Sequence, residues 1–203
     1  MKGINLTKVS NLATWIMWHN IRKNARLANN LDIRKSDIIT SEEYNQYVDK
    51  SYIHIKIDEP LLEWKLEDLV ASYTVIKDDK GICKFVICQY DYGDGLKRAN
   101  IILAECAEEY TNEYQYAMAK ILVDIKNDFD LICIWEPKSE GKKRSLKKLG
   151  FLKNIVSKEG SPFIIKILTD EEEKIQVLSN SDNWNPRQIE TDTMINLSKR
   201  KGI

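Results

Sequence analysis

The chain has 203 residues, of which 43% are hydrophobic, so it is long and apolar enough to bury a core and is not expected to be disordered throughout. Its 31 basic and 31 acidic residues give a net charge of zero, which argues against a strongly basic nucleic-acid-binding protein. Two histidines and four cysteines without a C-x-x-C pair argue against a structural zinc site, and we expect no metal.

The sequence also argues against a membrane-spanning or secreted protein. No stretch approaches the roughly 20 apolar residues that a membrane-spanning helix needs. Residues 8–30 carry charges among their apolar side chains, which is not the pattern of a secretory signal peptide. We therefore expect a cytoplasmic protein with no membrane contact, whose cysteines are reduced and buried as small apolar side chains.

The N-terminal third predicts one short strand and two helices. Residues 3–8 are interpreted as the strand. A helix is expected over residues 10–29, because Leu12, Trp15 and Ile16 fall at helical spacing and Ser10 can cap it. A second, short helix is expected from Thr40 or Ser41 to about residue 50.

The middle of the chain predicts an antiparallel meander. Residues 52–57 alternate with the period of a strand, and Glu59-Pro60 is expected to end it. Strands at residues 69–77 and 82–90 are expected to form a hairpin around the turn at residues 78–81, and residues 98–106 to add another strand.

The C-terminal half predicts helices alternating with strands. An apolar stripe predicts a helix that begins at Thr111, and residues 130–135 read as a central strand covered on both faces. A basic helix over residues 139–149 is expected to end at Gly150. Two strands at residues 151–156 and 162–168 are expected next, followed by a polar tail with a short helix near residues 171–178.

This order predicts an α/β (α+β) fold with a mixed, mostly antiparallel central sheet and helices on both faces, because a helical crossover follows the meander. We expect one domain over residues 1–168 and a polar C-terminal extension over residues 169–203.

Three stretches within this order, "GINLTKVSNLATWIMWHNI", "DDKGICKFVI" and "LKKLGF", resemble the GNAT superfamily of acyl-CoA-dependent N-acetyltransferases. The resemblance covers residues 3–168. It implies an N-acyltransferase that moves an acetyl group from acetyl-CoA to an amine on a small molecule or protein. It also implies that the pantetheine arm of the cofactor lies beside the strand at residues 98–106.

The resemblance further implies the residues of the site. Glu105 would be the catalytic base that takes a proton from the amine, directly or through water. The residues implied to contact the cofactor are Leu103, Cys106, Asn112, Tyr114, Gln115, Tyr116, Ser139 and Lys142. From the residues alone, Glu105 can equally be a solvent-facing carboxylate at a strand end, and Cys106 can equally be a buried structural thiol.

The cofactor-binding turn departs from the family pattern. The stretch "CAEEYTNEYQYAMAK" at residues 106–120 contains no glycine, and Glu108, Glu109 and Glu113 crowd a helix start that would have to receive a diphosphate. Leu146 stands four residues before Gly150, where the family often has a tyrosine that protonates the departing thiolate.

The alternative hypothesis is therefore a catalytically inactive protein of this fold that serves as a binding or regulatory module for a protein partner. Whether the chain is an enzyme is left open. Nucleic-acid binding through the basic helices is the weakest of the hypotheses, because the net charge is zero.

Overall fold

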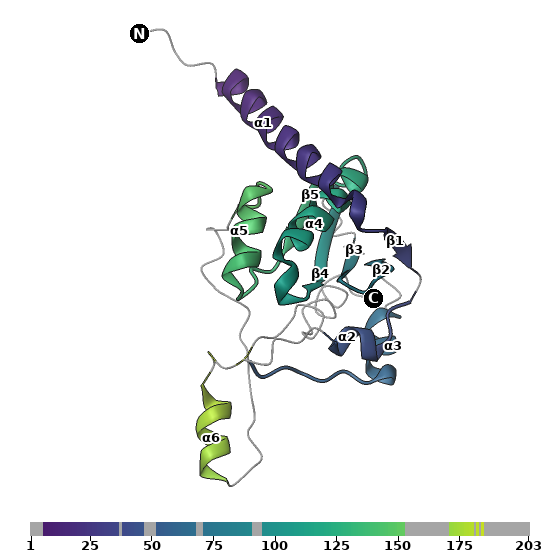
Figure 1. The fold of residues 1–203 in the computed structure, drawn as a ribbon, viewed down its shortest axis with the longest axis vertical. Coiled ribbons are helices and arrows are strands. Elements are labelled where there is room, and N and C mark those ends of the chain that lie inside the picture. The colour runs from purple at the N-terminus through teal and green to yellow at the C-terminus, as the bar shows by residue number, and fades with distance from the viewer. Residues whose placement is uncertain are drawn as a thin grey trace.

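The structure is a computed structural model, and Figure 1 shows its fold. It describes residues 6–36, 38–46, 52–67, 71–90, 95–152, 171–180, 182 and 184. The five strands of the sheet are β1 (Ile33–Ser36), β2 (Ala71–Asp78), β3 (Cys83–Tyr90), β4 (Arg98–Cys106) and β5 (Leu131–Ile134). They lie in the order β1-β2-β3-β4-β5, and only the β4–β5 pair is parallel among these described strands.

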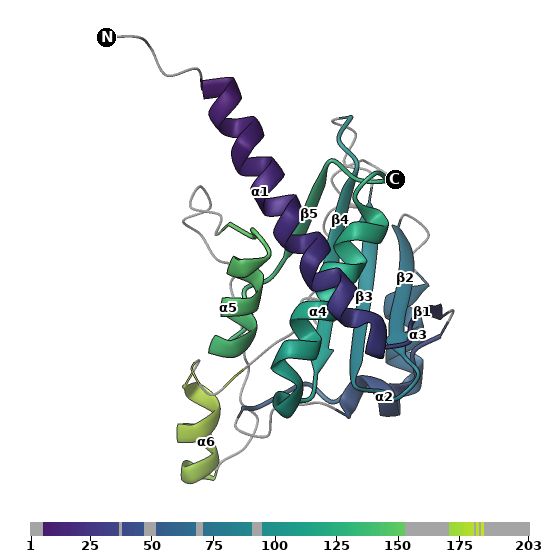
Figure 2. The same ribbon diagram turned by 45° about the horizontal axis from the view of Figure 1, so that its top comes forward.

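Helices cover both faces of this sheet, which confirms the predicted fold class (Figures 1 and 2). On one face lie α1 (Leu6–Leu27), α4 (Thr111–Ile125) and α5 (Glu140–Lys148). On the other lie α2 (Ser41–Asn45) and α3 (Glu59–Leu66). Alternation along β3 divides the core between them, because Phe85 packs with the first set and Val86 with the second.

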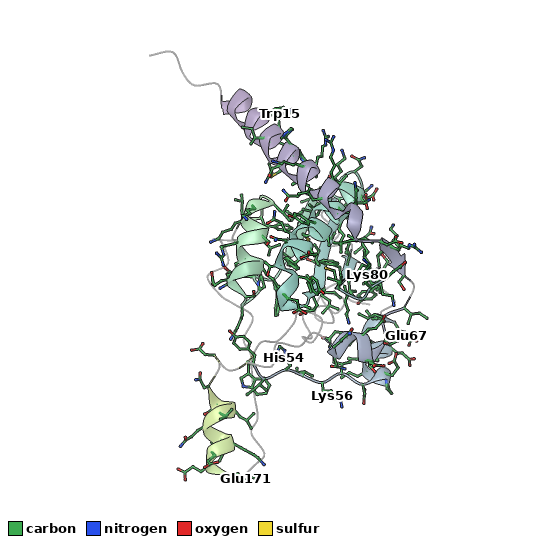
Figure 3. The ribbon with its side chains drawn as sticks, in the orientation of Figure 1. Trp15, His54, Lys56, Glu67, Lys80 and Glu171 are labelled. Atoms are coloured by element: carbon green, nitrogen blue, oxygen red, sulfur yellow. The ribbon has the colours of Figure 1, made fainter. Side chains whose placement is uncertain are left out.

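The first helix begins earlier than the sequence predicts. Residues 6–8 are helical, so the expected strand at residues 3–8 is wrong there, and residues 3–5 lie outside the described part of the chain. A 3-10 turn, η1 (Ala28–Asn30), follows α1. The N-terminal half of α1 extends beyond the sheet, and Trp15 is 63% exposed there (Figure 3). No helix among the described residues is both long and apolar enough to cross a membrane.

Two predictions in the middle of the chain are wrong. Residues 52–57 do not form a strand of the sheet; among them only Ile53 makes an isolated bridge, with Trp184. The edge position belongs instead to β1, which pairs with β2. Glu59-Pro60 opens α3 rather than ending a strand, because Asp58 accepts a hydrogen bond from the backbone N–H of Leu61 and proline is tolerated in a first turn.

The hairpin of β2 and β3, β4, α4 and α5 are confirmed where they were expected. Ser139 caps α5, and Gly150 ends it with φ +86, a left-handed conformation that glycine adopts without strain. Among the described residues β5 pairs only with β4, and Leu131 is 45% exposed. That β5 is a central strand stays a prediction, because most of the strands predicted to follow it lie outside the described residues. The strands predicted within residues 151–168 lie almost wholly outside the described residues, whereas α6 (Glu172–Ser179) is the short helix expected in the tail.

Candidate functional site

The candidate site lies where β4 continues past β5. Only residues 98–101 of β4 pair with β5, although β4 runs on to Cys106. Residues 102–106, which we call the open β4 segment, pair with β3 on one side and with no described strand on the other. Backbone N–H and C=O groups along such an edge are available to an extended ligand.

A β-bulge marks the beginning of the open β4 segment. Val86 of β3 pairs with Leu103, and the next residue, Ile87, pairs with Ile101, so Ile102 has no partner on β3. A bulge of this kind bends the strand and increases its twist. The break in register thus coincides with the point where β4 and β5 cease to pair.

A charged pair connects the open β4 segment to α5. Lys142 Nζ donates a hydrogen bond to Glu105 Oε2 over 2.7 Å, and the two side chains are only 18% and 17% exposed. The ammonium also lies 5.5 Å from the centroid of the Tyr114 ring, a cation–π geometry. The first turn of α5 is therefore held against the end of β4 by a charge-assisted bond in a half-buried setting.

Tyr114, in the first turns of α4, carries an unusual buried hydroxyl. The residue is fully buried, its ring packs beside Phe85, and its hydroxyl has no hydrogen-bond partner among the described residues. Burial, followed by the negative charge of Glu105, raises the pKa of this phenol above its usual range. Tyr114 thus keeps its proton and offers an unused donor next to Glu105.

Two thiols lie next to the group formed by Glu105, Lys142 and Tyr114. Cys83 and Cys106 face each other on β3 and β4 with their Sγ atoms 2.9 Å apart. Cys106 Sγ donates to the carbonyl oxygen of Tyr110, so the proton between the two sulfurs comes from Cys83. The hydrogen bond with Cys106, together with burial, raises the pKa of Cys83, so Cys83 is a buried thiol rather than a thiolate nucleophile.

The starts of α4 and α5 lie against each other. An added Cβ at Gly141 would come within 3.1 Å of Thr111 Cγ2, so glycine permits this close approach. The residue before α4, Tyr110, is the last residue of the 3-10 turn η2 (Glu108–Tyr110), and its side chain does not cap the helix. Glu109 is exposed and Glu113 is half-buried, so the acidic character seen in the sequence is retained at this helix start.

The structure brings together five of the nine residues proposed for the site: Glu105, Cys106, Tyr114, Ser139 and Lys142. The other four are not shown to contact this group. Leu103 is buried in the part of the core between the sheet and helices α2 and α3, and the Gln115 side chain donates a hydrogen bond to Asn24 on α1. Asn112 is exposed and Tyr116 is half-buried. The roles of all nine toward a cofactor remain predictions.

Cys83 was missed as a member of this cluster by sequence reasoning. The signal that could have identified it is the strand register, because Cys83 begins β3 and Cys106 ends β4, and antiparallel neighbours place these two ends together. No local motif reveals this pairing.

The chain's own residues fit the acyl-pantetheine end of acetyl-CoA better than its diphosphate end. The open β4 segment, which pairs with no described strand on one side, supplies backbone hydrogen-bonding groups for an extended amide-containing arm. The acidic start of α4 opposes a diphosphate. Among the described residues, no cluster of three or more His, Cys, Asp or Glu side chains could hold a metal ion.

The described elements follow the order expected from the sequence: a β2–β3–β4 meander, the crossover helix α4, the parallel strand β5, and α5 ending at Gly150. No protein-family model matches the sequence, and no curated protein matches it. Among solved structures, the chain is similar to the crystal structure of ribosomal-protein-alanine N-acetyltransferase from Brucella melitensis biovar Abortus 2308. The sequence identity is 15% and the TM-score 0.42, and the match covers 68% of this chain and 99% of that one.

Proposed function

We propose that this protein is an acyl-CoA-dependent N-acyltransferase that moves an acetyl group to an amine on a small molecule or protein. The observation that carries the proposal is the open β4 segment, where β4 continues beyond its last residue paired with β5. The edge that pairs with no described strand can hold the pantetheine arm by strand-like hydrogen bonds. Glu105, Tyr114 and Lys142 lie around the same segment and supply polar groups there.

The proposed chemistry follows from these side chains. Acetyl-CoA, when bound, supplies an acetyl thioester. Backbone N–H groups of the open β4 segment polarise its carbonyl, and the Glu105 carboxylate accepts a proton from the attacking amine. Tyr114 keeps its hydroxyl proton because burial raises its pKa, so it can donate a hydrogen bond to the departing sulfur.

Thermal melting and calorimetric titration with acetyl-CoA test this proposal. A ligand at about a hundred times its dissociation constant adds about 2.7 kcal/mol to the free energy of unfolding, which is readily seen as a rise in melting temperature. Adenosine alone, which lacks the pantetheine arm, serves as the control ligand. A flat titration at millimolar acetyl-CoA rejects the proposal.

The second candidate function is the non-catalytic binding module for a protein partner. The Lys142–Glu105 pair favours it, because the pair occupies the segment where an acyl group would lie. The variant Lys142→Ala separates the two functions. Acetyl-CoA binding by Lys142→Ala but not by the natural chain supports a permanently closed site and hence the module. Binding by the natural chain supports the transferase.

A further inference from the structure

Lys142 forms a structural ion pair, but its amine also lies where an amine that accepts an acyl group would lie. Its Nζ atom is 2.7 Å from Glu105 Oε2, beside the open β4 segment, and the side chain is only 18% exposed. The same Nζ lies over the ring of Tyr114, whose hydroxyl is buried without a partner among the described residues. An amine and a carboxylate that can take its proton thus meet at the open β4 segment, beside the ring of Tyr114.

We propose that Lys142 is a self-acylation site: the protein transfers an acyl group from an acyl-CoA thioester to the Nζ of its own Lys142. This inference rests on the proposed function, since the donor must reach the open β4 segment. It goes further by naming an acceptor. The Lys142 side chain would have to move away from Glu105 before a separate amine substrate could bind there. The Lys142 amine is therefore the first amine that an arriving thioester contacts.

The groups at the site account for every proton and electron pair that moves in this transfer. One proton of the Lys142 ammonium moves along its existing hydrogen bond to Glu105, which leaves a neutral amine. The Nζ lone pair forms a bond to the carbonyl carbon while the carbon–sulfur bond breaks, and the bonding pair leaves with the sulfur. A second Nζ proton passes to that sulfur. The products are an amide at Lys142, a protonated Glu105 and a free CoA thiol.

Acylation would change the site as well as the residue. The amide carries no charge and can no longer form the ion pair with Glu105. The first turn of α5 then loses its charged bond to β4. The reaction is therefore self-limiting, with one acyl group per chain, and it would release α5 from the end of the open β4 segment.

Lys143 is a matched control on the same helix. Its Nζ also lies 2.7 Å from a carboxylate, that of Glu140, but Glu140 is 73% exposed and lies on α5 itself. The two lysines therefore share sequence neighbourhood, helix and a carboxylate at the same distance. They differ in proximity to the open β4 segment, which is the feature that the inference requires.

The test is site-resolved mass spectrometry of the full-length protein after incubation with acetyl-CoA. We expect acetylation of Lys142 at least about 100-fold faster than that of Lys143, the contribution typical of a positioned base. Glu105→Gln should remove this preference, whereas Glu140→Gln should leave it unchanged. Equal rates at the two lysines, or an unaltered preference in Glu105→Gln, would overturn the inference.

A readout that does not depend on transfer completes the experiment. A small amine-reactive acetylating ester should label the more exposed Lys143 before Lys142, and CoA should protect Lys142 alone. CoA binding without protection or acetylation of Lys142 overturns the self-acylation but leaves the proposed transferase intact. Absence of CoA binding overturns both, since no donor then reaches the site.

Discussion

Lys142 and Glu105 are joined by a 2.7 Å hydrogen bond although 37 residues separate them in the sequence. One lies on the first turn of α5 and the other near the end of β4, so the bond spans the place where β4 and β5 cease to pair. It gives the same residues two competing roles, because a bond that stabilises the resting protein also occupies the candidate site. Substitutions at these two residues and their neighbours separate the two roles.

Lys142→Met should destabilise the protein. The Glu105 carboxylate would remain only 17% exposed without its cation, and an unpaired polar group of this kind costs about 1–3 kcal/mol. For a chain of this size each kcal/mol lowers the melting temperature by about 2–4 °C. Lys143→Met, the neighbouring change on α5, should leave the melting temperature unchanged. Equal losses of melting temperature in the two variants would show that the Lys142–Glu105 pair does not itself stabilise the folded protein.

Tyr114→Phe should have opposite effects on stability and on ligand binding. The hydroxyl is buried with no partner among the described residues, so its removal relieves a desolvation cost and should raise stability by about 1 kcal/mol. If the hydroxyl bonds to acetyl-CoA, the variant should bind that ligand about 5- to 10-fold more weakly. Urea unfolding and calorimetry measure the two quantities. A large loss of stability would contradict this account of the hydroxyl.

Stability should fall at alkaline pH because of Cys83 and Tyr114. The hydrogen bond with Cys106 raises the pKa of the Cys83 thiol, and burial raises that of the Tyr114 phenol. Both groups therefore stay protonated in the folded protein while the unfolded chain loses protons. Their contribution is complete below the unfolded pKa values, about 8.5 for cysteine and 10 for tyrosine, and is lost as the pH rises above them.

Urea unfolding across this pH range measures the effect. Each group should contribute a slope of up to about 1.4 kcal/mol per pH unit above its unfolded pKa. Cys83→Ser should flatten the curve from about pH 8.5 upward, and Tyr114→Phe only from about pH 10. A slope that neither variant changes would assign the alkaline loss to other groups.

Much of the fold follows from local signals. The turn at residues 78–81 between two apolar runs identifies the β2–β3 hairpin, and Gly150 after a basic helix identifies the end of α5. The unpredicted strand β1 and the incorrect strand at residues 52–57 have different causes. β1 is short and its central residues, Arg34 and Lys35, are exposed, so no apolar alternation announces it. Ile57, in contrast, is buried by α2 and α3 without entering the sheet.

The candidate site is predictable only in part, since its contacts join distant segments. The sequence indicates that Glu105 ends a strand and that Lys142 begins a helix, but not that they meet. Their contact depends on β5 being too short to cover the end of β4, which is a property of strand lengths rather than of any motif. The unused hydroxyl of Tyr114 is likewise visible only when its surroundings are known.

The acidic start of α4 gives a last prediction, concerning the affinity for acetyl-CoA. Glu109 is exposed next to this helix start, so Glu109→Gln should leave the fold intact while removing one repulsive charge from an approaching diphosphate. In a wet site that charge is worth about a five-fold change in dissociation constant, so the variant should bind acetyl-CoA more tightly.

The matched control is Asp124→Asn, which removes a carboxylate near the opposite end of α4, where Asp124 pairs with Lys120 over 2.7 Å. This change should leave the affinity unaltered, because the charge lies more than a screening length of about 8 Å along the helix from its start. Calorimetry at low and high salt should show the gain of Glu109→Gln shrinking as salt increases. Tighter binding in neither variant, or in both equally, would mean that the diphosphate does not approach the start of α4.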